Sequence, residues 1–354
     1  MKSQILTLHF MPWCQLDQQY DVGPVALIPF SRDHPPANLE PEIIQAVHAI
    51  LADFIAVDGR PVTRWVIVGL EGRVLVEGLE TSTAFDTIYD HAQMACLSSL
   101  ERREYLGRAE PYSNSECFAL YARQYRDGAA AAPPIFRRDS TRMGLAGDAL
   151  RVQIPVQTVA VPRPILNEAL YCALAELRSR MVEDERVDKW AVWAESIYSF
   201  NLANTDREGI SGHMEWVLMS SAFERLLRAR PSARDVAEKL VAALLSSDSP
   251  NIFASEVIHD WAKEFYRLRN DFAHGKLRTR QPRSWNSACH LLLGAIAFPL
   301  LVKNLLEHEG VYRPTENDRC EVAAFARFAV DLRDPGSQLA SWHQYVRNQR
   351  GDPV

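Results

Sequence analysis

The sequence lacks several features that would place it in a specialised class of protein. Its six cysteines include no C-x-x-C pair, which argues against a structural zinc site and against a disulfide framework. Scattered single cysteines instead favour a reducing, cytoplasmic compartment. The N-terminus shows no long apolar run with a small-residue cleavage site, so we expect no secretory signal. The most apolar stretch, 291–302, has 12 residues, whereas a membrane span needs about 20; we expect a buried core helix and no membrane association.

The chain also lacks an excess of positive charge, since its net charge is -6 over 354 residues. Proteins that coat nucleic acid non-specifically are usually basic, so any contact with nucleic acid must be local. The N-terminal region contains no Ser nucleophile elbow and no paired acidic motif, and Gly69-x-x-Gly72 is not followed by Lys-Ser/Thr. An unrelated hydrolase or a phosphate loop in that region therefore has no support.

Residues 1–161 are predicted to form a mixed α/β region. Branched residues and turn signals predict strands over 5–8, 25–30 and 117–125, and two more within 65–79 that are joined by a hairpin-like turn at Glu71–Gly72. Apolar residues at helical spacing predict helices over 40–57, with Pro41 at the first position, and over 84–106. We expect a loop over 128–134 and an edge strand or extended linker over 152–161.

From residue 162 onward the pattern becomes helical. Apolar stripes predict helices over 166–181, 190–200, 213–230, 255–274, 284–307, 316–331 and 337–348, and another that begins at Ser232. Ser232 and Asp235 resemble a capping box. We therefore predict an α+β protein: a mixed region over 1–161, a helical connector over 162–210, an all-α domain over 211–310, and C-terminal helices over 311–354 that pack on it.

One segment, Trp261–Lys276, combines basic residues with a candidate catalytic pair. Arg269 and His274 are separated by four residues, and Gly275 follows. Between residues 263 and 283, seven cations face only Glu264 and Asp271, a local balance of +5 in an acidic chain. The cations are Lys263, Arg267, Arg269, Lys276, Arg278, Arg280 and Arg283. Such a cluster predicts a partner that bears phosphate groups.

The residue types in this segment suit RNA cleavage without a metal ion or other cofactor. RNA supplies its own nucleophile, the 2′-hydroxyl, so an enzyme needs proton transfer and a cation for the charge on phosphorus. Histidine transfers protons near neutral pH, and arginine forks onto phosphate oxygens. A helix, however, places Arg269 and His274 about 140° apart, whereas Arg267, Asn270, Asp271 and His274 share a face. Two copies of the helix across a two-fold axis would complete the site, so we expect a homodimer.

A structural interpretation of the same residues stays open. An arginine near a helix C-terminus is commonly a surface ion-pair partner. A histidine just before glycine commonly caps the helix and meets its dipole. Under this interpretation the segment stabilises the fold and binds no substrate.

The segment resembles the R-x4–6-H signature of the HEPN superfamily, and most closely its Apea-like branch, through Tyr266, Arg269, Asn270, His274 and Gly275. A second similarity lies about 45 residues upstream, where Ser221–Leu226 reads as small residue, Ala, any residue, Glu, any residue, Leu. The resemblance covers about 211–309. It implies a helical bundle that dimerises through the motif helix and cleaves RNA in anti-phage defence or a toxin-like system.

The resemblance also implies roles for individual residues. Arg269 would bind phosphate or stabilise the transition state, His274 would be the general acid or base, and Asn270 would orient the phosphate or the histidine. Substrate contacts are expected from Arg267, Lys276, Arg278 and Arg280, and structural support from Tyr266, Glu224 and Asp271. The N-terminal region would be a sensor or a partner-binding module, with a regulatory protein or ligand as its partner. Some HEPN domains are catalytically silent and serve as scaffolds that bind nucleotide, RNA or protein, which is the alternative function.

Overall fold

The structure is a computed structural model, and it describes residues 5–37, 39–52, 54–77, 83–106, 112–126, 129–130, 136–139, 142–145, 152–154, 163–207, 209–245, 252–273, 284–333 and 340–350. The chain forms two compact units. Unit 1 comprises 1–103, 111–175 and 205–209, and unit 2 comprises 104–110, 176–204 and 210–354. The predicted domain bounds at 161, 210 and 310 stay predictions.

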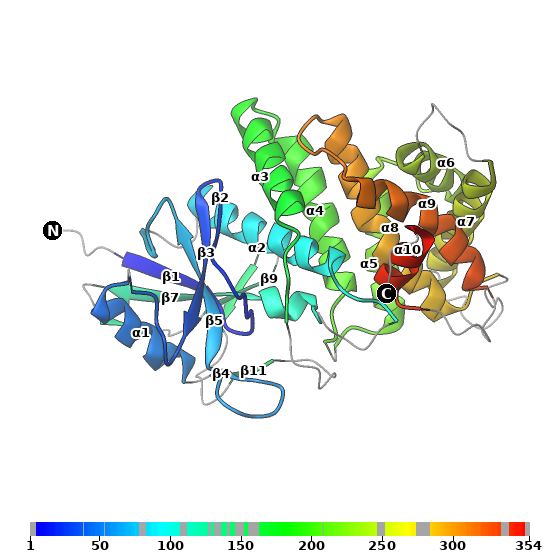
Figure 1. Cartoon of the computed structure of the whole chain (residues 1–354). Coiled ribbons are helices and arrows are strands. Elements are labelled where there is room, and N and C mark those ends of the chain that lie inside the picture. Colours follow the sequence, from blue (N-terminus) through cyan, green and yellow to red (C-terminus); the bar gives the residue numbers. More distant parts are fainter. Residues whose placement is uncertain are drawn as a thin grey trace. The chain divides into compact units, whose positions relative to one another are not determined.

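Unit 1 is built on an antiparallel sheet with the strand order β10-β9-β7-β1-β5-β3-β2, in which β6 also pairs with β1 and β8 with β7 (Figure 1). The strands are β1 (Ile5–Met11), β2 (Tyr20–Val22), β3 (Val25–Ser31), β5 (Arg64–Leu70), β6 (Leu75–Glu77), β7 (Leu120–Arg126), β8 (Ala129–Ala130), β9 (Phe136–Asp139) and β10 (Arg142–Leu145). The strands predicted over 5–8 and 25–30 are confirmed. The predicted strand over 117–125 begins later, because Ser115–Phe118 form a 3-10 turn that the Asn114 side chain caps. The predicted loop over 128–134 contains β8.

The two strands predicted within 65–79 and the turn that joins them at Glu71–Gly72 are confirmed: β5 and β6 lie on either side of that turn. Glu71 and Gly72 both have positive φ angles, 50° and 73°, and hydrogen bonds between Leu70 and Arg73 close the turn. Strands β5 and β6 do not form a two-stranded ladder; both pair with β1, at positions 9–11 and 6–8 respectively. After the turn the chain therefore pairs with the same neighbour, β1, further along that strand.

The first helix is shorter than the predicted range 40–57. Helix α1 (Pro41–Leu51) is followed by β4 (Phe54–Ile55), which pairs in parallel with β11 (Val152–Gln153). The buried Phe54 continues the apolar spacing of the helix, so the sequence pattern does not mark the end. The end of the helix is instead set by the pairing of β4 with β11, a segment almost a hundred residues further along the chain. Strand β11 also lies within the range 152–161, which is predicted to be an edge strand or a linker.

The two faces of the sheet carry different helices (Figure 1). Leu8 and Phe10 of β1 belong to an apolar cluster with Val47 and Ile50 of α1. On the opposite face, His9 lies beside Phe85 of α2 (Thr83–Glu101), with ring centroids 5.4 Å apart. Because successive side chains of β1 point to opposite faces of the sheet, α1 and α2 each pack against a different set of β1 residues. The α+β class that the sequence predicts is confirmed.

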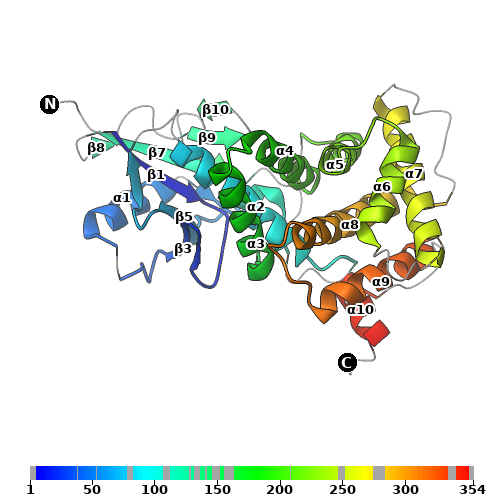
Figure 2. The same cartoon turned by 90° about the horizontal axis from the view of Figure 1, so that it is seen from above.

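Unit 2 contains a bundle of helices (Figure 2). Their bounds are α4 (Val187–Ala203), α5 (Gly212–Leu226), α6 (Ala233–Leu244), α7 (Ile252–Ala273), α8 (Ser287–His308), α9 (Glu316–Asp331) and α10 (Trp342–Arg350); α3 (Glu168–Glu183) passes into the unit at residue 176. Helix α5 packs against α4, α7 and α8, and α9 packs against α7, α8 and α10. Aromatic rings fill the centre, among them Trp216, Phe223, Trp261, Phe265 and Phe298.

Helix α8 is the apolar core of this bundle. Within the described part of the chain it is the one helix long and apolar enough to cross a membrane, and 72% of its apolar window is buried inside the protein. Its Gly294 allows close packing on α5, since a Cβ there would lie 3.1 Å from Met219 Cγ. The buried core helix expected around 291–302 is therefore confirmed.

The capping box predicted at Ser232 is wrong. Ser232 precedes α6, but its side chain makes no capping hydrogen bond. Asp235 instead accepts hydrogen bonds from the Arg230 backbone amide, at 2.7 Å, and from its guanidinium, at 3.2 Å. Asp235 therefore pairs with Arg230, which precedes Ser232 in the chain. A hydrogen bond from a charged guanidinium is stronger than one from the Ser232 backbone amide, which a capping box would use.

Candidate functional site

Helix α7 presents the motif segment, and its apolar residues fix the side of the helix that faces the bundle. Trp261, Phe265 and Leu268 are buried, and the Trp216 indole Nε1 donates to the Phe265 carbonyl at 3.0 Å. The described part of the helix runs to Ala273, and the predicted general acid or base, His274, is the next residue in the chain. His274, Lys276, Arg278 and Arg280 lie outside the described residues, as does Gly275.

Glu224 brings the two motif segments of the sequence together. The Tyr266 hydroxyl of α7 donates to Glu224 Oε2 of α5 at 2.5 Å. The same oxygen lies 3.6 Å from Arg269 Nη2. Burial and the hydrogen bond to Glu224 raise the pKa of Tyr266 above its usual range, so the phenol stays a neutral donor. A carboxylate from one helix thus orients both a phenol and a guanidinium on another.

Arg269 is held in place on several sides. Its Nη1 donates to Asn270 Oδ1 at 3.0 Å, and its guanidinium lies over the Tyr266 ring, 5.3 Å from the centroid. Its Nε is buried and has no hydrogen-bond partner among the described residues. The side chain remains 23% exposed, so an oxygen-rich ligand can approach a guanidinium whose orientation is already set.

The other predicted residues of this helix are not part of that contact set. Arg267 is exposed, and Asp271 is half-buried; within the described ranges neither forms an ion pair. The structure therefore joins Arg269 with Asn270, Tyr266 and Glu224, and it leaves Arg267 as an exposed cation two residues away on the same helix.

Glu264 anchors the far side of α7 and was not singled out by the sequence motifs. Its Oε1 accepts hydrogen bonds from the Ser284 and Trp285 backbone amides, at 3.1 and 3.3 Å. It also accepts one from the ring Nε2 of the buried His290, at 3.1 Å. Glu264 thereby links α7 to the residues that precede α8. The only sequence signal was that Glu264 is one of two acids within the basic stretch 263–283.

These donors set the ionisation of Glu264. Burial raises the pKa of the carboxyl, but the hydrogen bonds from His290 and the two amides outweigh that effect and lower it to about 2. Burial lowers the pKa of His290, so the imidazole is neutral and donates its Nε2–H. The charged form of Glu264 is thus tied to the native fold.

Glu264→Gln is expected to lower the free energy of unfolding at pH 7 by about 2 kcal/mol, a figure reduced for the partial exposure of the carboxylate. The folded pKa lies below the unfolded value, so this stability is present above pH 4.5 and is lost as the pH falls towards 2. Urea unfolding at several pH values from 7 to 3 measures the free energy of unfolding of wild type and variant, and we expect the two values to converge as the pH falls. Glu256→Gln, an exposed change on the same helix, serves as the control, and a pH-independent difference would contradict the assignment.

Comparison with known proteins gives no match to this chain: no protein-family model, no curated protein and no solved structure is similar to it.

Proposed function

We propose that this protein is a metal-independent endoribonuclease of the HEPN type that acts as a homodimer in the cytoplasm, in anti-phage defence or in toxin-like growth arrest. The observation that carries the proposal is the contact of Glu224 with both Tyr266 and Arg269. These residues come from the two separate segments that resemble the family. Their meeting at one polar cluster is what a shared functional site requires.

The proposed reaction uses groups of the RNA and of the motif helix. A base removes the 2′-hydroxyl proton, the 2′-oxygen attacks phosphorus, and the 5′-oxygen leaves with a proton, which yields a 2′,3′-cyclic phosphate and a 5′-hydroxyl. His274 transfers protons, and Arg269 binds the phosphoryl oxygens as negative charge builds up. Asn270 holds the guanidinium plane through its 3.0 Å contact. Arg267, Lys276, Arg278 and Arg280 are proposed to bind neighbouring phosphates.

A catalytically silent scaffold is the second candidate, and one observation favours it. The Arg269 guanidinium already contacts Glu224, Asn270 and the Tyr266 ring. An arginine with so many internal contacts also fits a structural role, in which the helical unit binds nucleotide, RNA or a partner protein. In either case the N-terminal unit is proposed to sense a regulatory protein or ligand.

Cleavage of a mixed RNA pool in EDTA tests the proposal directly. We expect the purified wild-type chain to cleave RNA equally with and without EDTA, and to leave 2′,3′-cyclic phosphate ends. RNA with 2′-O-methyl groups provides the matched control, because it lacks the nucleophile and stays intact. Cleavage that EDTA abolishes, or equal cleavage of the methylated RNA, would refute this mechanism. Sedimentation of the same sample shows whether the active species is a dimer.

A further inference from the structure

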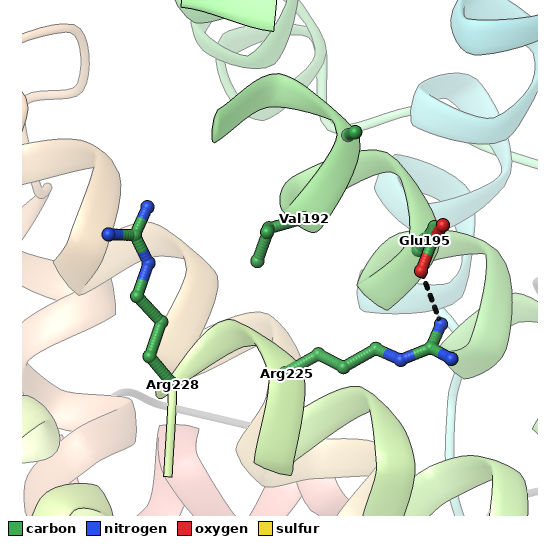
Figure 3. Close-up of a pocket in the computed structure, with 5 residues that line it drawn as sticks. Val192, Glu195, Arg225 and Arg228 are labelled. Atoms are coloured by element: carbon green, nitrogen blue, oxygen red, sulfur yellow. Dashed lines mark ion pairs between the residues drawn. The ribbon is translucent and has the colours of Figure 1, made fainter. Parts of the chain in front are cut away.

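A small pocket between α4 and the C-terminal end of α5 is lined in part by two arginines. It has a volume of about 250 Å³ and is lined by Ala191, Val192, Glu195, Arg225 and Arg228. Pockets for drug-sized ligands usually measure about 300–1,000 Å³, so this one suits a phosphate group with part of a nucleotide. Figure 3 shows the two arginine side chains diverging from the end of α5 beneath Val192.

Arg228 occupies a backbone position that normally favours glycine. Its φ is 47°, and it follows the last turn of α5, where the Ala229 amide donates to the Glu224 carbonyl at 2.9 Å and the Arg228 amide to the Arg225 carbonyl at 2.9 Å. This is the hydrogen-bond pattern of a Schellman cap, in which glycine is usual because it has no Cβ. An arginine there is strained relative to glycine because of its Cβ, and its interaction with the helix dipole offsets that strain only in part.

The two arginines differ in how available they are. Arg225 pairs with Glu195 at 2.8 Å, but both side chains are largely exposed, at 49% and 63%. Such an exposed pair contributes little to stability, so Arg225 exchanges its partner at little cost. The exposed Arg228 guanidinium forms no ion pair with any residue that the structure describes, and Figure 3 shows it extending past Val192 and away from Glu195. The pocket thus holds one unpaired and one exchangeable guanidinium beside an aliphatic wall.

We propose that this pocket binds a nucleotide phosphate, with Arg228 as its principal ligand and Arg225 as a second donor released from Glu195. The aliphatic side chains of Ala191 and Val192 then contact the sugar or base. The phosphate belongs either to an RNA strand or to a free nucleotide. The inference rests on the proposed function only where it names RNA as a source; recognition of the phosphate itself does not depend on cleavage.

Binding is measured with two probes, AMP and a short fluorescein-labelled 2′-O-methyl RNA that the protein cannot cleave. We expect Arg228→Gly to weaken binding about tenfold or more, because it removes a charge-assisted hydrogen bond. The thermal midpoint stays unchanged or rises, because glycine relieves the positive φ. Arg228→Lys keeps the positive charge but lacks the bidentate guanidinium, so we expect a loss of affinity smaller than that of Arg228→Gly. Glu195→Gln is expected to tighten binding about two- to fivefold, because it frees Arg225.

The control is Arg234→Ala on α6, which removes an 80% exposed arginine paired with Glu238. Weakened binding of both probes by Arg228→Gly alone supports a general nucleotide site, and weakening of RNA alone supports a strand site. Equal losses in Arg228→Gly and Arg234→Ala, no binding by the wild type, or displacement of the RNA by an acidic peptide but not by AMP would overturn the proposal. Since no turnover is needed, a protein without ribonuclease activity gives the same readout.

Discussion

Arg269→Ala is expected to lower the rate of RNA cleavage by about 10²–10³-fold, the usual loss when one preorganised donor to a developing oxyanion is removed. Arg269→Lys rescues little of it, because an ammonium keeps the charge but cannot fork onto two phosphoryl oxygens. His274→Ala gives a loss of about 10²–10⁴-fold through the missing proton transfer. Single-turnover kinetics on a defined RNA measure each variant.

The control for Arg269 is Arg319→Ala, an exposed arginine on α9, for which cleavage stays within about twofold of wild type. Circular dichroism and sedimentation establish that each variant is folded and dimeric. Wild-type cleavage by a folded Arg269→Ala dimer would refute the site assignment. If the variant instead loses only thermal stability, and Glu224→Ala does the same without any change in RNA cleavage or binding, the scaffold function is the better account of this cluster.

Lys303→Met is expected to lower the free energy of unfolding by about 3–5 kcal/mol. Lys303 Nζ of α8 donates to Asp318 Oδ1 at 2.6 Å and to Glu321 Oε2 at 3.0 Å, both on α9. The three side chains are 2%, 8% and 4% exposed. Methionine fills similar space, but it leaves two carboxylates in the core without this cation, and uncompensated buried charge is costly.

Further hydrogen bonds keep Asp318 in its charged form. Its Oδ2 accepts from the Tyr312 hydroxyl at 3.0 Å and from the Thr315 amide at 2.7 Å. Burial raises the pKa of Asp318, but Lys303 and Thr315 outweigh that effect and lower it. Without Lys303, the remaining donors still favour the charged form of Asp318. The cost of burying that charge is then no longer offset by a cation.

Urea unfolding at pH 7 measures the effect, and two further variants locate it. Lys189→Met, on the exposed side of α4, changes the stability by less than about 0.5 kcal/mol. The triple variant Lys303→Met, Asp318→Asn, Glu321→Gln recovers much of the loss, because it removes the buried charges together. A loss below about 1 kcal/mol in Lys303→Met would show that water reaches the carboxylates and that the charges do not hold α8 to α9.

The sequence by itself determined the helices of the second unit. Apolar residues repeat at helical spacing in α7, α8 and α9, and their backbone hydrogen bonds close within four residues, so a local pattern is sufficient. The branched residues of β1 and β3 similarly identified two of the strands. The basic segment around Arg269 and the upstream Glu224 were also readable, because residue type and spacing carry that information.

Tertiary structure decided the features that depend on distant partners. The end of α1 is set by the pairing of Phe54 with Val152, and β5 and β6 lie along the same side of β1 because both pair with it. The contact between Glu224 and Arg269 spans 45 residues. In each case the local sequence pattern is compatible with several interaction partners. A hydrogen bond or ion pair between residues far apart in the sequence selects one of them, and its energy is available only once the chain has folded.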